Sequence, residues 1–207
     1  GRVPSPRYGL AMRARKALAI VTVAAFLAGA CSDDGEDAAP PTTEAPAVDA
    51  AEISTRLDVE PVPFDELMPA AIEDIQQFWA GEAGLSDAYG IDYERIDESD
   101  QHPYSEDDLP PPCAGHSFTW DEIAFNAFWC RDPGFVAWDE QELMPMLYSD
   151  YGPFAVAMVM AHEWGHAVQT QVGFESRTID MEQQADCFAG AWSADVLERE
   201  PAELGFV

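Results

Sequence analysis

Two histidines separated by three residues, with a glutamate directly after the first, constrain this chain more than any other feature. They form the stretch His162-Glu163-Trp164-Gly165-His166. On an α-helix, positions i and i+4 lie about 40° apart around the axis, so both imidazoles can point at one ion. Glu163 lies about 100° from His162, near enough to contact a water on that ion. This is the arrangement that a zinc hydrolase needs.

The surrounding residues predict one continuous helix from residue 153 to residue 172, with Gly173 as its stop signal. Residues 154–161 are apolar on every side, which is typical of a helix buried in a core. An alternative is that both histidines are core residues held by hydrogen bonds. That alternative is disfavoured because a buried Glu163 would also need a partner.

A catalytic zinc site has three protein ligands and an open fourth position for water. A second predicted helix, residues 181–190, carries Glu182 and Asp186 four positions apart and therefore on one face. We assign Glu182 as the third ligand of one Zn²⁺ ion and Asp186 as an acceptor for the N–H of a ligand histidine. The alternative is that both acids lie on a solvated face. Glu175 and Asp180 are weaker ligand candidates because they fall in the turn between the helices.

The two motifs read His162-Glu163-x-Gly165-His166-x-x-Gln169 and Glu182-x-Gln184-Ala185-Asp186-Cys187-Phe188-Ala189-Gly190. Together they resemble the putative neutral zinc metallopeptidase family, a bacterial group with gluzincin-like ligands. The resemblance covers the chain from about residue 64 to about residue 192. It implies that His162, His166 and Glu182 bind zinc and that Glu163 is the catalytic acid/base.

The resemblance also implies the fold, a mainly helical α+β domain of the zincin type with a small sheet, spanning residues 61–207. In zincins a strand near the active helix often lines the substrate backbone, and the resemblance suggests residues 135–139 for that role. From these residues alone, an ordinary sheet strand is the simpler interpretation. Because proteins of this kind usually continue past the second motif, we expect the domain to lack a C-terminal part.

Hydrophobic periodicity predicts the other elements of the domain. Residues 63–80 repeat apolar side chains at helical spacing and predict an amphipathic helix that packs on the core. Residues 124–129 and 135–138 are candidate short strands around the turn Asp132-Pro133-Gly134. The stretch from residue 104 to 114, which includes three consecutive prolines, is expected to be a loop.

Four further side chains could take part in chemistry but belong to no motif. His102 and His116 fall in predicted loops, and we expect both to be surface residues. Tyr148 and Tyr151 are candidates for stabilising the oxyanion during hydrolysis.

The N-terminal residues 1–30 have the pattern of a signal peptide, with Met12 as the expected true start. A basic region of Arg13, Arg15 and Lys16 precedes an apolar run of about 14 residues, which is too short to span a bilayer. The run ends in Leu27-Ala28-Gly29-Ala30-Cys31, which resembles a lipoprotein signal with Cys31 as the lipidated residue. Ordinary cleavage, giving a freely secreted protein, is the alternative.

Residues 31–60 predict a disordered acidic and proline-rich tether, and this tether favours the lipoprotein interpretation. All 39 acidic residues lie after Ala30, where only five arginines and no lysine oppose them, so that part of the chain has a net charge near −34. Such a charge excludes nucleic-acid binding, which needs Lys and Arg to contact phosphates. The expected partners are a peptide or protein substrate and a membrane reached through the lipid on Cys31.

Export also agrees with the cysteines, because disulfides persist outside the cytoplasm. If Cys31 is lipidated, Cys113 and Cys130 are the natural pair. A bridge between them closes a short loop and would contribute about 3 kcal/mol. Cys187 is then unpaired, or it pairs with one of these two; the sequence leaves both open.

These features predict an exported, lipid-anchored zinc endopeptidase in which Glu163 is the general base for a zinc-activated water. Two alternatives belong to other classes. One is a non-catalytic binding or scaffold lipoprotein with a structural metal. The other is a zinc hydrolase that acts on amides other than peptides.

Overall fold

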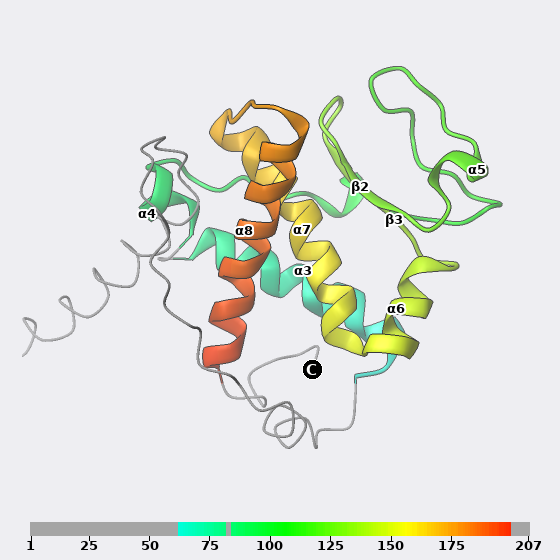
Figure 1. Cartoon of the computed structure of the whole chain (residues 1–207), viewed down its shortest axis with the longest axis horizontal. Helices are drawn as coiled ribbons and strands as arrows, with labels where there is room; N and C mark the ends of the chain where they lie inside the picture. The colour runs from blue at the N-terminus through cyan, green and yellow to red at the C-terminus, as the bar shows by residue number, and fades with distance from the viewer. Residues whose placement is uncertain (1–61, 82–83, 200–207) are drawn as a thin grey trace, which may run out of the picture.

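The computed structural model describes residues 62–81 and 84–199. The predicted signal peptide, the tether and Cys31 therefore lie outside the described residues. The described part is a mixed α+β fold, mostly helical, with one three-stranded sheet, as predicted (Figure 1). Within these residues no helix has the length and apolar character needed to cross a membrane.

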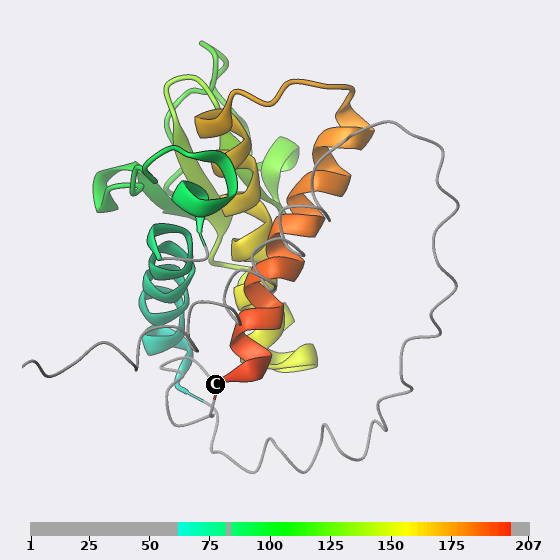
Figure 2. The same cartoon turned by 90° about the vertical axis from the view of Figure 1, so that its left-hand side faces the viewer.

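The helix α7 (Pro153–Val172) lies at the centre of the fold and matches the predicted bounds. Pro153 begins it at a position where a missing N–H is harmless, and Gly173 ends it in the left-handed conformation. It packs against α3 (Phe64–Ala80) on one side and α8 (Thr178–Glu198) on another (Figure 2).

The core between these three helices explains their apolar faces. Several of its largest fully buried side chains come from α3, α7 and α8: Leu67, Ile75, Met160, Trp164 and Trp192. A further helix, α6 (Leu143–Tyr151), packs on α7 near its N-terminal end. The second motif lies on a longer helix than predicted, because α8 runs 21 residues rather than ten.

The sheet has the order β1-β3-β2, with β1 (Gln101–Tyr104) parallel to β3 (Phe135–Asp139) and β2 (Ala127–Cys130) antiparallel to it. Every residue of β3 is buried, and both of its edges are paired. A substrate backbone therefore cannot pair with β3, and the expectation for residues 135–139 is wrong. The edge strand that packs on α7 is β2.

Five elements were not predicted: β1, α4 (Leu85–Tyr89), the 3₁₀ turn η1 (Glu98–Asp100), α5 (Trp120–Ile123) and α6. Because His102 lies in β1, it is not a loop residue. Its ring is half-buried and packs edge-on against Phe135, with centroids 5.1 Å apart. His116, by contrast, is exposed as expected.

The predicted disulfide between Cys113 and Cys130 is present, with Cα atoms 5.7 Å apart. It joins the loop before α5 to the end of β2. Cys187 takes no part in this bridge, and it is not a free thiol in the structure. Neither state expected for Cys187 is therefore observed.

Candidate metal centre

The structure brings the three predicted zinc ligands together at the contact between α7 and α8. Glu182 Oε2 lies 3.2 Å from His162 Nε2 and 3.4 Å from His166 Nε2. The two imidazole rings are nearly perpendicular, with centroids 4.8 Å apart. Among the described residues these three form the one cluster of His, Cys, Asp and Glu side chains that could hold a metal ion.

The other nitrogen of each ring has a partner that determines its protonation. His162 Nδ1 lies 2.9 Å from Asp186 Oδ1, a carboxylate oxygen that only accepts, so Nδ1 carries the proton. His166 Nδ1 lies 2.9 Å from Gln169 Oε1. The orientation of that amide follows from its other end, where Gln169 Nε2 donates to the carbonyl of Met181 at 2.6 Å. In the neutral form, both histidines therefore present an unprotonated Nε2 to Glu182.

Three acceptor atoms thus face one another: two Nε2 lone pairs and one carboxylate oxygen. At 3.2–3.4 Å such atoms repel one another unless positive charge lies between them. A proton would satisfy a single pair, whereas a divalent cation satisfies all three at once.

The two spacings from Glu182 Oε2 are also compatible with zinc. Zinc bonds of about 2.0–2.1 Å in a tetrahedral arrangement separate neighbouring ligand atoms by about 3.3–3.4 Å. The two measured distances from Glu182 Oε2 lie within about 0.2 Å of that separation. Two imidazoles and one carboxylate are a donor set found in catalytic zinc sites, which leave a fourth position open.

Glu163 lies one residue from the first histidine and is buried, with 7% of its surface exposed. The pKa of Glu163 is raised to about 7, mainly by burial and also by the nearby Glu182; a protonated His166 and the Trp129 backbone N–H act in the opposite direction. A divalent cation beside Glu163 would also favour its charged form. Glu163 is therefore held as a proton acceptor beside the cluster without being part of it.

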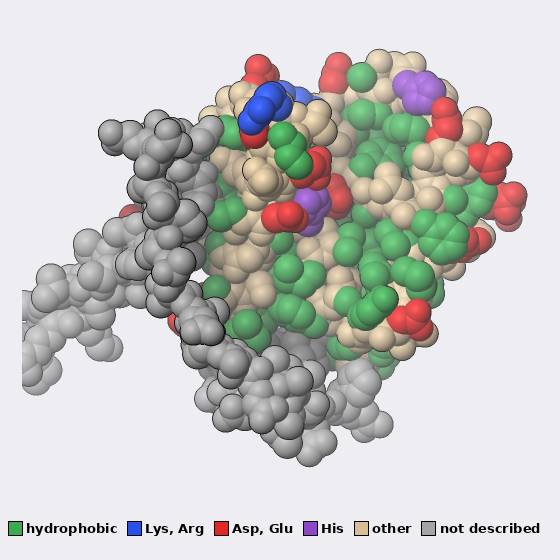
Figure 3. Space-filling view, viewed as in Figure 1, with side chains coloured by type: hydrophobic (Ala, Val, Ile, Leu, Met, Phe, Trp, Pro, Cys, Tyr) green, Lys and Arg blue, Asp and Glu red, His purple; other side chains and the backbone are tan. Residues whose placement is uncertain are grey.

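A cleft of about 560 Å³ opens over this cluster. Its walls come from β2, from α7 and from the start of α8, and they include Asn126, Ala127, Phe128, Trp129, Arg131, Thr170, Ser176, Thr178 and Met181. In the space-filling view, a histidine flanked by acidic side chains reaches the surface (Figure 3).

Four other candidates from the sequence lie elsewhere. Tyr148 donates to the carbonyl of Val62 at 2.8 Å, and Tyr151 is exposed; neither lines the cleft, so neither is an oxyanion partner there. Glu175 binds Arg131 and Asp180 binds Arg177, in both cases at 2.7 Å. Neither acid belongs to the group of side chains that could hold a metal ion.

The close approach of α8 to α7 depends on Gly165. A Cβ atom at this position would lie 3.0 Å from both Cα and the carbonyl oxygen of Ala185, and these backbone atoms cannot move away cheaply. Ala185 stands one residue before Asp186 and three after Glu182, so this contact sets the distance of both acids from the histidines.

We expect Gly165→Ala to push α8 outward and to weaken zinc binding by at least about tenfold. The clash costs about 1–3 kcal/mol, against about 1 kcal/mol gained from the better helix propensity of alanine. Zinc titration of the two proteins measures the change. The matched control is Gly190→Ala on α8, where a Cβ atom meets nothing within 4 Å. Equal zinc affinity of Gly165→Ala and the original protein would show that this contact does not position Glu182.

We expect Asp186→Ala to lower zinc affinity about 10- to 100-fold, because the variant no longer orients His162 through its Nδ1–H. The fold should be unaffected, since 74% of the Asp186 side chain is exposed. Competition with a chromophoric chelator measures the affinity. Glu198→Ala removes an equal charge from the same helix, about 18 Å away, and controls for the change in net charge. If both variants lose the same affinity, Asp186 acts only through its charge.

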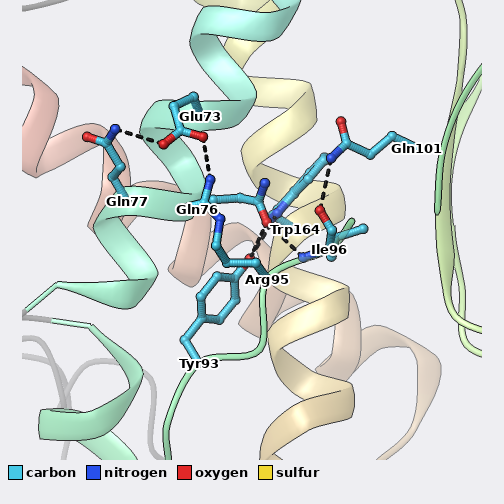
Figure 4. A network of polar contacts seen from close by, with 8 residues as sticks. All are labelled: Glu73, Gln76, Gln77, Tyr93, Arg95, Ile96, Gln101 and Trp164. Atoms are coloured by element: carbon cyan, nitrogen blue, oxygen red, sulfur yellow. Dashed lines mark hydrogen bonds and ion pairs between the residues drawn. The ribbon is translucent and has the colours of Figure 1, made fainter. Parts of the chain in front are cut away.

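A chain of buried hydrogen bonds holds the opposite side of α7 (Figure 4). Trp164, the fully buried middle residue of the histidine motif, donates from Nε1 to Tyr93 Oη at 3.1 Å. Tyr93 in turn donates to Gln76 Oε1 on α3 at 3.3 Å, and the Ile96 N–H donates to the same oxygen at 2.8 Å. With Trp164 held on the inner side, the two histidines face outward toward α8.

The structure also shows supporting residues that the sequence did not identify as such. Gln169 orients His166, and Trp129 contributes its backbone N–H to Glu163. The indole of Trp129 donates to Thr170 Oγ1 at 3.0 Å, which fixes β2 on α7. Gln169 lies three residues after His166, on the same face of the helix, and that spacing was the signal that could have revealed it.

Comparison with known proteins agrees with this geometry. Residues 122–205 match the family described as putative neutral zinc metallopeptidase. The resemblance seen in the two motifs is therefore confirmed. The matched region contains all three clustered residues, Glu163 and the edge strand β2.

The relatives that match this region are described as uncharacterized proteins. The protein Rv2575 of Mycobacterium tuberculosis is 39% identical over an alignment of 80 residues. The alignment covers 32% of this chain and 27% of that protein. The protein YpfJ of Escherichia coli is 33% identical over an alignment of 97 residues. The alignment covers 38% of this chain and 33% of that protein. The chain thus matches about a third or less of the length of these relatives. No solved structure matches it.

Proposed function

We propose that this protein is a zinc-dependent peptidase of the zincin type, with His162, His166 and Glu182 as ligands of one zinc ion. The observation that carries the proposal is the convergence of three acceptor atoms beside a buried carboxylate, at the base of an open cleft. The match to a zinc metallopeptidase family supports it.

When bound at such a site, zinc lowers the pKa of a water molecule to about 7 and polarises a carbonyl group. The residues of the chain supply the remainder. Glu163 takes a proton from the attacking water and returns it to the leaving amine. The Trp129 N–H holds the Glu163 carboxylate in place, and Asp186 and Gln169 keep both imidazoles in the protonation state that binds a metal.

The edge strand β2 is suited to an extended peptide. The carbonyl of Asn126 accepts from the Asp139 N–H at 3.0 Å, so alternate residues of β2 turn their main-chain groups toward β3. The main-chain groups of Trp129 point away from β3, because its N–H is directed toward Glu163. By the same alternation the main-chain groups of Ala127 face the cleft, where a substrate backbone can pair with them.

The experiment that tests the proposal uses the zinc-loaded chain with unfolded casein and with a mixture of tryptic peptides. The expected result is new peptide termini, found by mass spectrometry, that disappear with a chelator and return with zinc. Cleavage of a panel of non-peptide amides, with all peptides intact, would identify the rival amide hydrolase instead. Zinc binding with no hydrolysis of either kind would favour the scaffold alternative.

We further propose that the protein is exported and anchored through a lipid on Cys31. The support is the sequence alone: a basic region, an apolar run and small residues before Cys31, followed by an acidic tether. Mass spectrometry of the N-terminal peptide of the mature protein tests it. A diacylglyceryl group on Cys31 is expected, and an unmodified cysteine would contradict the anchor.

A further inference from the structure

The walls of the cleft differ in charge from the rest of the molecule. The chain has 39 acidic residues, yet among the described residues that line the cleft only Glu163 and Glu182 are acidic. Both already have roles at the candidate metal centre. Apart from these two and the histidines, the lining is uncharged except for one residue, Arg131. A cleft shaped for a basic substrate would have acids free to bind it.

Arg131 stands at a defined position relative to the candidate catalytic carboxylate. Trp129 lies beside Glu163, because its backbone N–H lowers the pKa of that carboxyl and both residues line the cleft. Arg131 follows two residues later in the turn after β2, at most about 7 Å away along the chain, and its side chain lines the same cleft as Trp129. A substrate group bound by Arg131 would therefore lie within about two residues of the substrate peptide bond that is held beside Glu163.

The backbone around Arg131 is held firmly. Cys130, the preceding residue, is fully buried and bridged to Cys113. The carbonyl of the following residue, Asp132, accepts from the Ala114 N–H at 2.7 Å. A backbone held in this way lowers the entropy lost when a ligand binds Arg131, because only the side chain remains to be ordered.

The present partner of Arg131 leaves most of the guanidinium available. Glu175 binds it through Nη2 alone, at 2.7 Å, and both side chains are well exposed. Exposed pairs of this kind contribute about 0–1 kcal/mol, so a ligand can displace Glu175 or share the guanidinium with it. Arg177, which is nearby in sequence to Glu175, is instead bound in two places by Asp180.

We infer that Arg131 is a specificity-determining residue that binds a carboxylate of the substrate, within two residues of the cleaved bond. This inference rests on the proposed peptidase function. Guanidinium groups bind carboxylates through two parallel hydrogen bonds, which suits the free face of Arg131. The carboxylate can belong to an Asp or Glu side chain or to the C-terminus of the substrate.

The test measures binding, so that it does not depend on hydrolysis. Zinc-loaded full-length Glu163→Gln protein is titrated into four fluorescent peptides of equal length. These carry a central Glu or Gln, and each has a free or an amidated C-terminus. The original protein is tested in parallel for cleavage of the same peptides. A second set of titrations uses Glu163→Gln combined with Arg131→Gln, with Arg131→Lys, or with Arg95→Gln.

We expect the peptide with the preferred carboxylate to bind about 5-fold more tightly than its neutral counterpart, with a ratio that falls as salt is added. Arg131→Gln should bring the ratio to about 1, and Arg131→Lys should keep part of it. Arg95→Gln removes an arginine that is paired with Glu73 outside the cleft, and it should change nothing. Whether the ratio follows Glu or the free C-terminus identifies the source of the carboxylate.

A ratio near 1 in the Arg131-containing protein, or a ratio unchanged by Arg131→Gln, would overturn the inference. If the original protein cleaves these peptides without such a preference, the inference fails while the peptidase function stands. A preference in binding without any cleavage by the original protein would leave only the contact between Arg131 and a carboxylate standing and would overturn the peptidase function.

Discussion

Glu163→Gln is expected to lower the rate of peptide hydrolysis about 10²- to 10⁴-fold while zinc binding stays near one equivalent. The amide has nearly the shape of the carboxylate, but it cannot take a proton from water. Glu163 is not among the three clustered ligand atoms, so its replacement leaves them in place. Steady-state hydrolysis of a fluorogenic peptide and metal analysis of the same sample measure the two effects.

The matched control for this variant is Glu175→Gln, which changes an exposed acid that binds Arg131 and is not among the residues that line the cleft. It should keep most of the hydrolysis rate. Full activity of Glu163→Gln at equal zinc content would contradict the assigned role of Glu163 as general base.

Glu182→Ala is expected to lose zinc almost entirely and hydrolysis with it. Two histidines would remain, and they cannot complete the three-ligand set of a catalytic zinc site. Zinc should also cease to raise the melting temperature of the protein, because a ligand stabilises only the fold that binds it. Metal analysis after dialysis and thermal unfolding with and without zinc measure both changes.

Glu175→Ala is the sharpest comparison for this second variant, since the sequence also allowed Glu175 as a ligand. The structure places its carboxylate on Arg131, so zinc content should not change. If Glu175→Ala loses zinc and Glu182→Ala retains it, the assignment of the third ligand is wrong.

The parts of the fold that the sequence predicted well are those set by local spacing. The bounds of α7 followed from its apolar run and from Gly173, and α3 began within one residue of its predicted start. The grouping of His162, His166 and Glu182 was also predictable, because each of the two motifs places its polar side chains on one helical face.

The order of the strands was not predictable in this way. β1 is only four residues long and contains Pro103, so it has no alternating apolar pattern to detect. If β1 is overlooked, one edge of β3 is left unpaired, and a substrate backbone could pair with it. With β1 paired to it, β3 becomes the buried central strand, and β2 becomes the edge that faces the cleft.

Contacts between distant segments were likewise invisible in the sequence. The pairing of Arg131 with Glu175 joins the end of β2 to the turn before α8, 44 residues later. The clash that restricts position 165 comes from Ala185 on another helix. Gly165 belongs to the histidine motif, and the packing of α7 on α8 explains why it has no side chain.

Zinc K-edge X-ray absorption of the protein loaded with one equivalent of zinc tests the central claim most directly. We expect about four nitrogen or oxygen atoms around the zinc at about 2.0–2.1 Å, with the scattering pattern of two imidazoles and no sulfur. A sulfur neighbour at about 2.3 Å, the mark of a cysteine-bound structural site, would contradict it.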